Sequence, residues 1–325
     1  DELPARWEPL ARLLLRAEGV ASSFLEGVRA PLADVAAAEL DPTLPGETAK
    51  WVADNLAAVT AAIEQSHGSP LSTAALHHWH RTVIAGTSHL LPEHLGRFRE
   101  VQGWTGGTSP LDAALVTPPP GEIDGLMGDL VAFVNRDDLD PVTQAAVAHA
   151  QFEVIHPYGD GNGRVGRVLV VWLLTRRLRL VSPPPVSVRI ALDRGGYLSG
   201  LKRFRLGEVD PWIAWFADVV HDAGDATVNL VRAIAALETR WNERLAGVRV
   251  DAAARRTLAL LPAHPVVTAS TIADETGISA RAARNALATL AERGIVEPFD
   301  PRHRAAGRPR HWWVARELVD LVADW

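Results

Sequence analysis

The sequence has no cysteine among its 325 residues, which excludes disulfides, thiolate metal sites and cysteine nucleophiles. It has no apolar run that approaches the roughly 18 residues a membrane span requires. Its first ten residues, DELPARWEPL, lack the apolar core of a signal peptide. The net charge of −6 argues against a surface coated uniformly for nucleic acid or anionic lipid. These absences predict a cytoplasmic protein without a membrane partner.

Long alanine- and leucine-rich segments, punctuated by proline and glycine, predict a mainly α fold in more than one domain. The expected organisation is an N-terminal helical region over 1–60, a central domain over 61–222, a linking helix over 223–250 and a last domain over 251–325. Helices are expected at about 8–26, 48–66, 72–86, 122–135, 141–155, 163–177, 194–206, 210–222 and 225–246. The segment 97–120, with a Gly-Gly pair and a closing triple proline, predicts a β-hairpin or ordered flap.

The stretch HPYGDGNGRVGR at 156–167 follows one predicted helix and opens the next. Its glycines at 159, 161 and 163 allow the backbone to bend and to turn its N–H groups inward. Such an arrangement at a helix N-terminus binds phosphate, because bulky side chains would block the close approach. The loop therefore predicts an anion site.

Charged side chains in the same stretch extend this prediction. Arg164 and Arg167 are three residues apart on the first turn of the helix, so both are expected to face the anion. Asp160 is a hard oxygen ligand suited to Mg²⁺, and His156 can take a proton near neutral pH. A base, a metal ligand and two cations around an anion site indicate nucleotidyl or phosphoryl transfer.

The stretch resembles the signature of Fic-domain proteins, HPFxDGNGRxxR, with Tyr158 in the place of phenylalanine. That side chain is expected to pack inside the fold. The run AHAQFEVIHP, the flap with Trp104 and Gly106, and the WIAWF segment at 212–216 are also similar to the family. The resemblance covers about residues 8–222 and implies a Fic-type helical bundle with a small β-hairpin flap.

Fic enzymes mostly transfer AMP from ATP to a hydroxyl group of a target protein, so the resemblance implies this activity. It implies that His156 is the general base, that Asp160 holds Mg²⁺ against the phosphates, and that Arg164 and Arg167 hold the outer phosphates. The implied anion hole consists of Gly161, Asn162 and Gly163.

The flap at about 99–107 is implied to bind the target protein by strand addition, a mode that needs little side-chain readout. The flap residues implied to lie near the nucleotide are Gly103, Trp104, Thr105 and Gly106. Tyr197 resembles the first of a tyrosine pair that borders adenine in many members, but Leu198 and Arg205 depart from the rest of that pattern. A core aromatic is the alternative interpretation of Tyr197.

Near the start, AEGVASSFLEGVRA places Ser22 and Glu26 four residues apart on one helix face, with Gly27 as a helix stop. Taken alone this is an ordinary helix end, but it resembles the inhibitory pattern of the family, (S/T)xxxE(G/N). The resemblance implies that Glu26 pairs with Arg167 and keeps it from the γ-phosphate of ATP. In some relatives the same glutamate helps to remove AMP, so deAMPylation is left open.

Residues 251–325 predict a winged helix-turn-helix domain, with a helix near 252–261, a turn at ETGIS and two strand-like runs, IVEPF and HWWVA. The basic residues of the expected wing and recognition helix are Arg302, Arg304, Arg308, Arg310, Arg281 and Arg284. They fit DNA phosphates, but the chain as a whole is acidic, so a protein-contact role is favoured over DNA binding.

Two functions of different class therefore stand. The first is an autoinhibited, Mg²⁺-dependent protein adenylyltransferase. The second is a winged-helix transcription regulator whose Fic domain only senses a nucleotide, and a transferase that uses another nucleotide donor is a further alternative. The base His156 favours a transferase, because a sensor does not need one. The cluster of His77, His78 and His80 is interpreted as solvated or satisfied histidines, since a third metal ligand is lacking. The target protein and a homodimer are left open.

Overall fold

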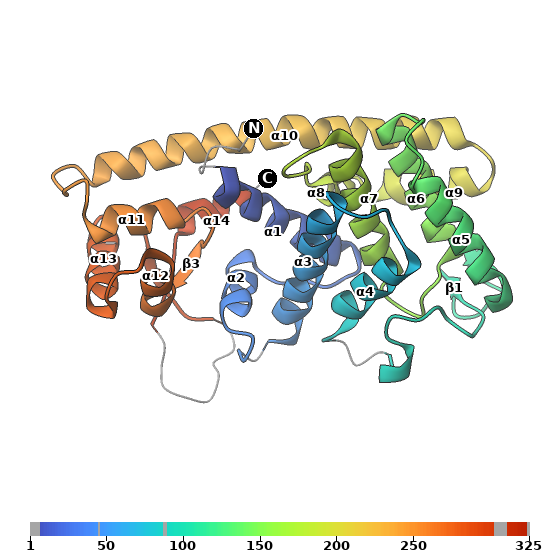
Figure 1. The fold of residues 1–325 in the computed structure, drawn as a ribbon, viewed down its shortest axis with the longest axis horizontal. Helices are drawn as coiled ribbons and strands as arrows, with labels where there is room; N and C mark the ends of the chain where they lie inside the picture. The colour runs from blue at the N-terminus through green and yellow to red at the C-terminus, as the bar shows by residue number, and fades with distance from the viewer. Residues whose placement is uncertain (1–6, 45, 87–89, 302–310, 324–325) are drawn as a thin grey trace. The chain divides into compact units, whose positions relative to one another are not determined.

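The computed structural model describes residues 7–44, 46–86, 90–301 and 311–323 (Figure 1). The chain forms two compact units. The first unit comprises Asp1–Ala17, Arg29–Ala53 and Asp225–Trp325, and the second unit comprises Glu18–Val28 and Asp54–Gly224. The boundaries fall inside α1 (Trp7–Leu25), α3 (Glu47–Ser66) and α10 (Val209–Arg244), so these three helices contribute residues to both units. The mainly α prediction is confirmed.

Two buried helices, α6 and α7, form the centre of the second unit. Besides the three shared helices, this unit contains α4 (Thr73–Ile84), α5 (Ile123–Val134), α6 (Pro141–Ile155), α7 (Asn162–Leu178), α8 (Val186–Leu192) and α9 (Arg194–Arg205). Asp140 caps α6 by accepting a hydrogen bond from the Thr143 N–H at 2.8 Å. α7 is buried nearly all round, because its run VLVVWLL puts apolar side chains on every face. The loop that joins α6 to α7 is therefore anchored at both ends in the core.

The flap is a short antiparallel hairpin of β1 (Trp104–Thr105) and β2 (Leu115–Val116), with Trp104 opposite Val116. Short 3-10 turns lie on either side of it, at Pro92–His94 and Pro120–Glu122. Among the described residues no third strand pairs with β1, so one edge of the hairpin is open. The predicted hairpin is confirmed.

The first unit contains a helix-turn-helix beside a three-stranded antiparallel sheet. Its further elements are α2 (Leu32–Leu40), α11 (Ala253–Leu260), β3 (Val266–Thr268), α12 (Ala269–Thr276), α13 (Ala280–Glu292), β4 (Glu297–Phe299), β5 (Trp312–Val314) and α14 (Arg316–Ala323). The strand order is β3-β5-β4. Thr268 and Ser279 cap α12 and α13, and Gly277 ends α12 at φ 68°. These caps produce the turn that the sequence ETGIS predicts.

The winged-helix assignment of 251–325 remains a prediction. The tip of the expected wing, with Arg302, Arg304, Arg308 and Arg310, lies outside the described residues. Arg281 and Arg284 are exposed on α13. The domain boundaries at 60, 222 and 250 also remain predictions.

One predicted break is wrong. Residues 210–222 and 225–246 were expected as two helices, but α10 is continuous from Val209 to Arg244. Gly224 lies in its middle, and a helical glycine costs only about 1 kcal/mol relative to alanine, which packing along a long helix outweighs. The short elements α2, α8, α14 and β3 were not predicted, because they hold too few residues for a periodic pattern.

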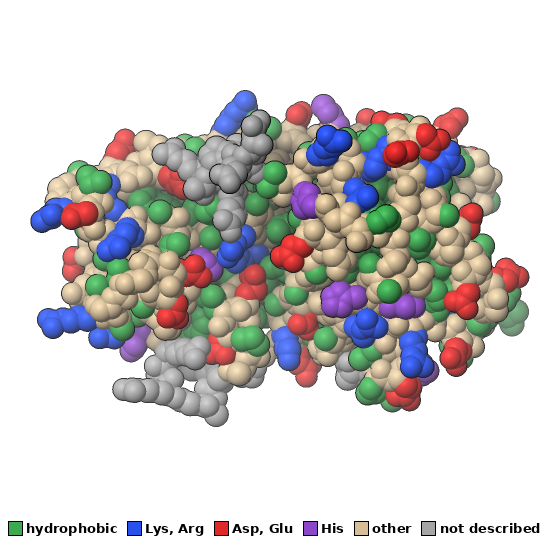
Figure 2. Space-filling model, in the orientation of Figure 1, with side chains coloured by type: hydrophobic (Ala, Val, Ile, Leu, Met, Phe, Trp, Pro, Cys, Tyr) green, Lys and Arg blue, Asp and Glu red, His purple; other side chains and the backbone are tan. Residues whose placement is uncertain are grey.

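Charged side chains of both signs are interspersed over the face drawn in Figure 2. No helix within the described residues combines the length and the apolar character needed to cross a bilayer. On the drawn face no patch of a single charge sign dominates.

Candidate functional site

His156 stands at the end of α6 in an unusual backbone conformation. Its φ of 51° is left-handed, and among the described non-glycine residues only Arg179 shares this property. The ring atom Nδ1 lies 3.3 Å from the Glu153 carbonyl oxygen. Because a carbonyl can only accept, Nδ1 carries the hydrogen and Nε2 is left as the basic atom. Burial lowers the pKa of His156 below its ordinary value, so the ring is neutral at pH 7.

A direct test of this pKa is an NMR titration of the ring, assigned by comparison with His156→Ala. We expect the midpoint to lie below 6.5, the ordinary histidine value, because burial disfavours the charged ring and protonation then needs a lower pH. In Glu26→Gly the midpoint falls further, since the carboxylate that favours the imidazolium is gone. A midpoint at or above 6.5 would contradict the burial of the base.

Arg99 holds His156 and the flap together, and sequence reasoning missed it. The side chain donates from Nε to the His156 carbonyl at 2.8 Å, from Nη1 to the Val101 carbonyl at 2.8 Å and from Nη2 to the Pro118 carbonyl at 2.7 Å. Nothing in the run RFREV distinguishes this arginine from its exposed neighbours. The contacts fix the left-handed residue and tie it to both ends of the flap.

The loop between α6 and α7 is braced by its own side chains. Asn162 accepts from the Tyr158 N–H and donates to the Tyr158 carbonyl, both at 2.8 Å. The side chain of the predicted anion-hole residue Asn162 is therefore hydrogen-bonded within the loop, and only its backbone N–H is left to bind an anion. Tyr158 is buried, which confirms that the residue replacing phenylalanine packs inside.

Two histidines of α4, His77 and His80, support this loop as satisfied side chains. His80 stacks on Tyr158 at 4.0 Å, accepts from the Gly96 N–H at 2.8 Å and lies 3.1 Å from the Asp160 carbonyl. Burial lowers its pKa to about 4. His77 lies 3.1 Å from the Tyr158 hydroxyl. These bonds account for two of the three histidines in the cluster, and His78 is exposed.

The N-terminus of α7 is an open anion seat. Gly161, at φ 77°, precedes the helix without a side-chain cap, so the first N–H groups of α7 have no acceptor in the helix. A Cβ atom on Gly163 would collide with the Glu26 carboxylate and would lie 3.0 Å from Arg167 Nη1. A side chain at 163 would therefore displace the Glu26 carboxylate, and only Gly161 of the three loop glycines has a positive φ. The Glu26 carboxylate thus lies directly over the first turn of α7.

Arg167 binds the end of α1 at three points. Its Nη2 donates to Glu26 Oε1 at 2.7 Å and to the Ser22 carbonyl at 2.8 Å, and its Nε donates to Ser22 Oγ at 2.9 Å. Only 3% of the Arg167 side chain is exposed, against 37% for Glu26. The contact expected between Glu26 and Arg167 is present, and Gly27 ends the helix at φ 82° as expected.

The charges around Glu26 explain its ionisation. Burial acts to raise its pKa, but Arg167, followed by Arg164 and His156, outweighs burial, so the pKa is lowered. The pKa of Arg167 is raised, because Glu26 outweighs the effect of burial there. An ionised carboxylate therefore lies at the N-terminus of α7, beside Arg167.

Arg164 differs from Arg167 in its contacts. It is buried, it donates from Nη1 to the Val83 carbonyl at 3.2 Å, and its Nε has no partner among the described residues. That both arginines face one anion stays a prediction. Arg164 is tied to α4, although its charge acts on Glu26 and Asp160.

Asp160 keeps part of its carboxylate available. Oδ1 accepts from the Gly161 N–H at 2.6 Å, and the residue is half-buried. No group of three histidine or acidic side chains that could hold a metal ion occurs among the described residues. One carboxylate oxygen beside an anion seat fits Mg²⁺, which usually takes its other ligands from water and substrate phosphates.

The predicted flap residues lie on the hairpin. Trp104 is 41% exposed, and Gly106 adopts φ 71° at the turn end of β1. The Gly103 carbonyl accepts from the Thr117 N–H at 3.1 Å, which closes the base of the hairpin. The open edge of β1 is therefore free for strand addition.

Tyr197 is a core residue. It is buried, its hydroxyl lies 2.9 Å from His149 Nε2, and its ring contacts Trp212 at 6.2 Å between centroids. This favours the core-aromatic alternative over an adenine contact.

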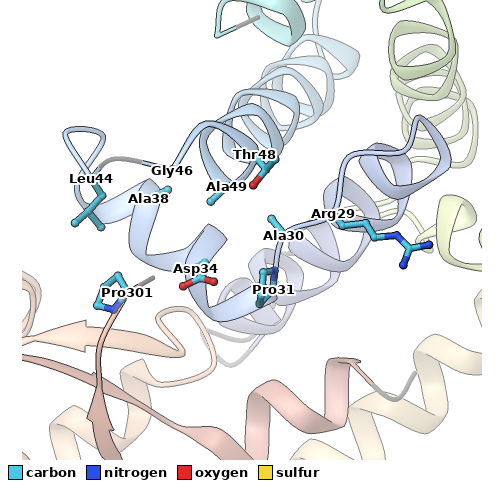
Figure 3. A pocket seen from close by; sticks show the side chains of 10 residues that line it. All are labelled: Arg29, Ala30, Pro31, Asp34, Ala38, Leu44, Gly46, Thr48, Ala49 and Pro301. Atoms are coloured by element: carbon cyan, nitrogen blue, oxygen red, sulfur yellow. The ribbon is translucent and has the colours of Figure 1, made fainter. Parts of the chain in front are cut away.

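A pocket of about 120 Å³ in the first unit contains none of the predicted site residues (Figure 3). It is lined by residues of α2, of the start of α3 and of the segments on either side of α2, with Pro301 at one side. In Figure 3 the Arg29 guanidinium points away from Asp34. The pocket gives no support to a second nucleotide site.

The comparisons with known proteins match this geometry. The profile of the Fic/DOC family covers residues 70–174, which include the flap, His156 and the anion seat. Residues 70–174 match the Fic/DOC family. This match covers 105 residues of a longer chain, so it describes that segment and not the rest.

Named relatives extend the similarity. "Protein adenylyltransferase Fic" of Drosophila melanogaster is 33% identical over 188 residues, which are 55% of this chain and 35% of the relative. The protein of the same name from Culex quinquefasciatus is 33% identical over 142 residues, 43% of this chain and 25% of the relative. The chain thus spans about a third or less of these relatives.

A solved structure covers nearly the whole chain. A Fic family protein from Desulfovibrio desulfuricans G20 has a TM-score of 0.57 at 20% identity and covers 97% of each chain. At this identity the match supports the fold alone.

Proposed function

We propose that this chain is an autoinhibited, Mg²⁺-dependent protein adenylyltransferase that transfers AMP from ATP to a hydroxyl group of a target protein. The observation that carries the proposal is the ionised Glu26 carboxylate, held by Arg167 over the first turn of α7. A seat that holds a carboxylate in this way can hold a phosphate group. The name of the Drosophila and Culex relatives supports the choice of AMP as the transferred group.

His156 performs the proton transfer in the proposed reaction. Its Nε2 takes the proton of the target hydroxyl, whose oxygen forms a bond to the α-phosphorus of ATP. The bond from that phosphorus to the β-phosphate breaks, and pyrophosphate leaves. Arg99 positions the base for this step, because it holds the His156 carbonyl.

The anion seat neutralises the phosphates. The free N–H groups of α7, together with Arg164 and Arg167, stabilise negative charge that builds up in the transition state. Asp160 would hold Mg²⁺ against the phosphates, and the bound ion would supply charge neutralisation and orientation. The exposed edge of β1 would align the target segment.

Glu26 opposes this reaction while it stays on Arg167. Its carboxylate places negative charge where a phosphate group should lie, and it occupies the guanidinium that should bind that group. ATP then binds weakly or in an unproductive position.

The position of the label in ATP tests the proposal. Glu26→Gly protein is incubated with Mg²⁺ and ATP labelled at either the α- or the γ-phosphate. Label from the α-phosphate alone supports AMP transfer, and label from the γ-phosphate indicates phosphate transfer instead. No label from either, with ATP bound, would favour a nucleotide sensor.

Metal removal gives a further expected result. Excess EDTA abolishes label transfer by Glu26→Gly, and excess Mg²⁺ restores it, because without a cation the Asp160 carboxylate faces the phosphates as a like charge and repels them. Transfer at an unchanged rate in EDTA would contradict the role of Asp160 as a metal ligand. Asp160→Ala is the matched variant, since it should require more Mg²⁺ for the same rate.

A further inference from the structure

A second carboxyl on α1, that of Glu18, is buried deeper than Glu26 and takes no part in the proposed reaction. It is 3% exposed. Glu18 precedes Ser22 by four residues and Glu26 by eight, so all three lie along one face of the chain's helical path. Eight residues of helix correspond to about 12 Å, which places Glu18 well behind the anion seat.

Glu18 is bonded to the start of α8. Its Oε2 accepts from the Ser187 N–H at 2.8 Å, and its Oε1 accepts from the Ser187 hydroxyl. Both residues belong to the second unit. The bonds join chain positions far apart in sequence, so they fix α1 against the helices around the loop.

Asn55 of α3 adds to this attachment. It donates from Nδ2 to the Gly19 carbonyl at 3.1 Å and to Ser23 Oγ at 3.3 Å. Neither Ser187 nor Asn55 bonds to a residue of the stretch 156–167. These contacts therefore attach α1 to its neighbours without any bond to the anion seat.

The ion pair of Glu26 is exposed to water at its carboxylate end. The Glu26 side chain is 37% exposed, whereas that of Arg167 is 3% exposed, so water competes for the carboxylate and not for the guanidinium. The bonds of Glu18 and Asn55 are buried. When a buried polar group loses its hydrogen-bond partner, the cost of its desolvation is no longer offset, so the loss is destabilising. The residence of Glu26 on Arg167 must then depend on how firmly the buried part of α1 is held.

We propose that Glu18 and Ser187 form a latch, the Glu18–Ser187 latch, which sets how often Glu26 leaves Arg167. Glu18 is a positioning residue: it touches no substrate and acts through α1. When the latch opens, the end of α1 moves and the seat is free for ATP. Burial raises the pKa of Glu18 to about 7, although the hydrogen bonds from Ser187 and the charge of Arg167 act to lower it. This inference rests on the proposed function.

The test is the initial rate of label transfer from α-labelled ATP by Glu18→Ala and Ser187→Ala, each made in wild type and in Glu26→Gly. In wild type we expect both to raise the rate about three- to tenfold, the factor that corresponds to losing one or two buried hydrogen bonds. In Glu26→Gly we expect no further rise, because there is no carboxylate left to hold. Hydrogen exchange of residues 18–28 should also become faster in both single variants.

Asn135→Ala is the matched control, since Asn135 makes two bonds of 2.8 and 2.9 Å to the backbone of Leu71 and does not touch α1. We expect it to leave the rate at the wild-type level. Glu18→Gln keeps the size of the side chain and replaces Glu18→Ala if the latter does not fold.

The outcomes separate the two ideas. Absence of label on Glu26→Gly overturns the proposed function whatever Glu18 does. Label on Glu26→Gly, with the latch variants at the rate of wild type and Asn135→Ala, overturns the latch. An equal rise from the latch variants with and without Glu26 also overturns it, because the effect would not pass through that residue.

Discussion

Glu26→Gly should raise the rate of label transfer from α-labelled ATP to the protein itself by at least about tenfold over wild type, the factor that corresponds to 1.4 kcal/mol. The substitution removes the carboxylate from Arg167 and from the first turn of α7. The guanidinium, 3% exposed in its present pairing, is then left with Ser22 and an empty seat. A buried cation without its partner favours any anion that can reach it.

Glu26→Gln is the matched variant for this experiment. It keeps the shape of the side chain and one hydrogen-bond acceptor but loses the charge, so an intermediate rate is expected. ATP affinity, measured by calorimetry, should rise in the order wild type, Glu26→Gln, Glu26→Gly. A wild-type rate in Glu26→Gly, with ATP bound at least as tightly, would show that Glu26 does not restrain the reaction.

His156→Ala in the Glu26→Gly background should lower the rate by about 10²- to 10⁴-fold, the range that a positioned general base contributes. The ring is neutral at pH 7 because burial lowers its pKa, and Nδ1 is committed to the Glu153 carbonyl. Alanine leaves the anion seat in place, so ATP affinity should stay unchanged. The loss then falls on the rate of the chemical step alone.

His78→Ala provides the control, because His78 is an exposed histidine of α4 outside the loop. His78→Ala, made in the Glu26→Gly background, should transfer label at the same rate as Glu26→Gly alone. A His156→Ala protein that transfers at that rate as well would remove His156 from the role of base. Loss of ATP binding in His156→Ala would mean that the substitution had damaged the seat.

The local parts of this site could be predicted from the sequence. The stretch 156–167 carries its chemistry in consecutive residues, and the hydroxyl–carboxyl pair of Ser22 and Glu26 lies within one helix turn. The resemblance to Fic-domain proteins supplied the one long-range pairing, between Glu26 and Arg167, which the structure contains. Tyr158 as a packed side chain followed from the same resemblance.

The supports of the site could not be predicted, because each joins segments far apart in the sequence. Arg99 reaches the His156 carbonyl across 57 positions, Asn55 reaches Gly19 across 36, and Glu18 reaches Ser187 across 169. No local pattern distinguishes these side chains from solvated ones. The expected break near 223 was wrong for a related reason, since a glycine in a long helix is a weak local signal that tertiary packing overrides.

Arg99 donates its hydrogen bonds to backbone carbonyls and not to a carboxylate. The carbonyls belong to the base residue His156 and to both ends of the flap, so the three segments share one rigid clamp. A target strand that adds to β1 and shifts the hairpin would pull on the same guanidinium that holds the left-handed turn at His156. In the proposed reaction, binding of a target strand to the flap would therefore also set the orientation of His156, and a peptide that binds poorly to the flap would misdirect the proton acceptor.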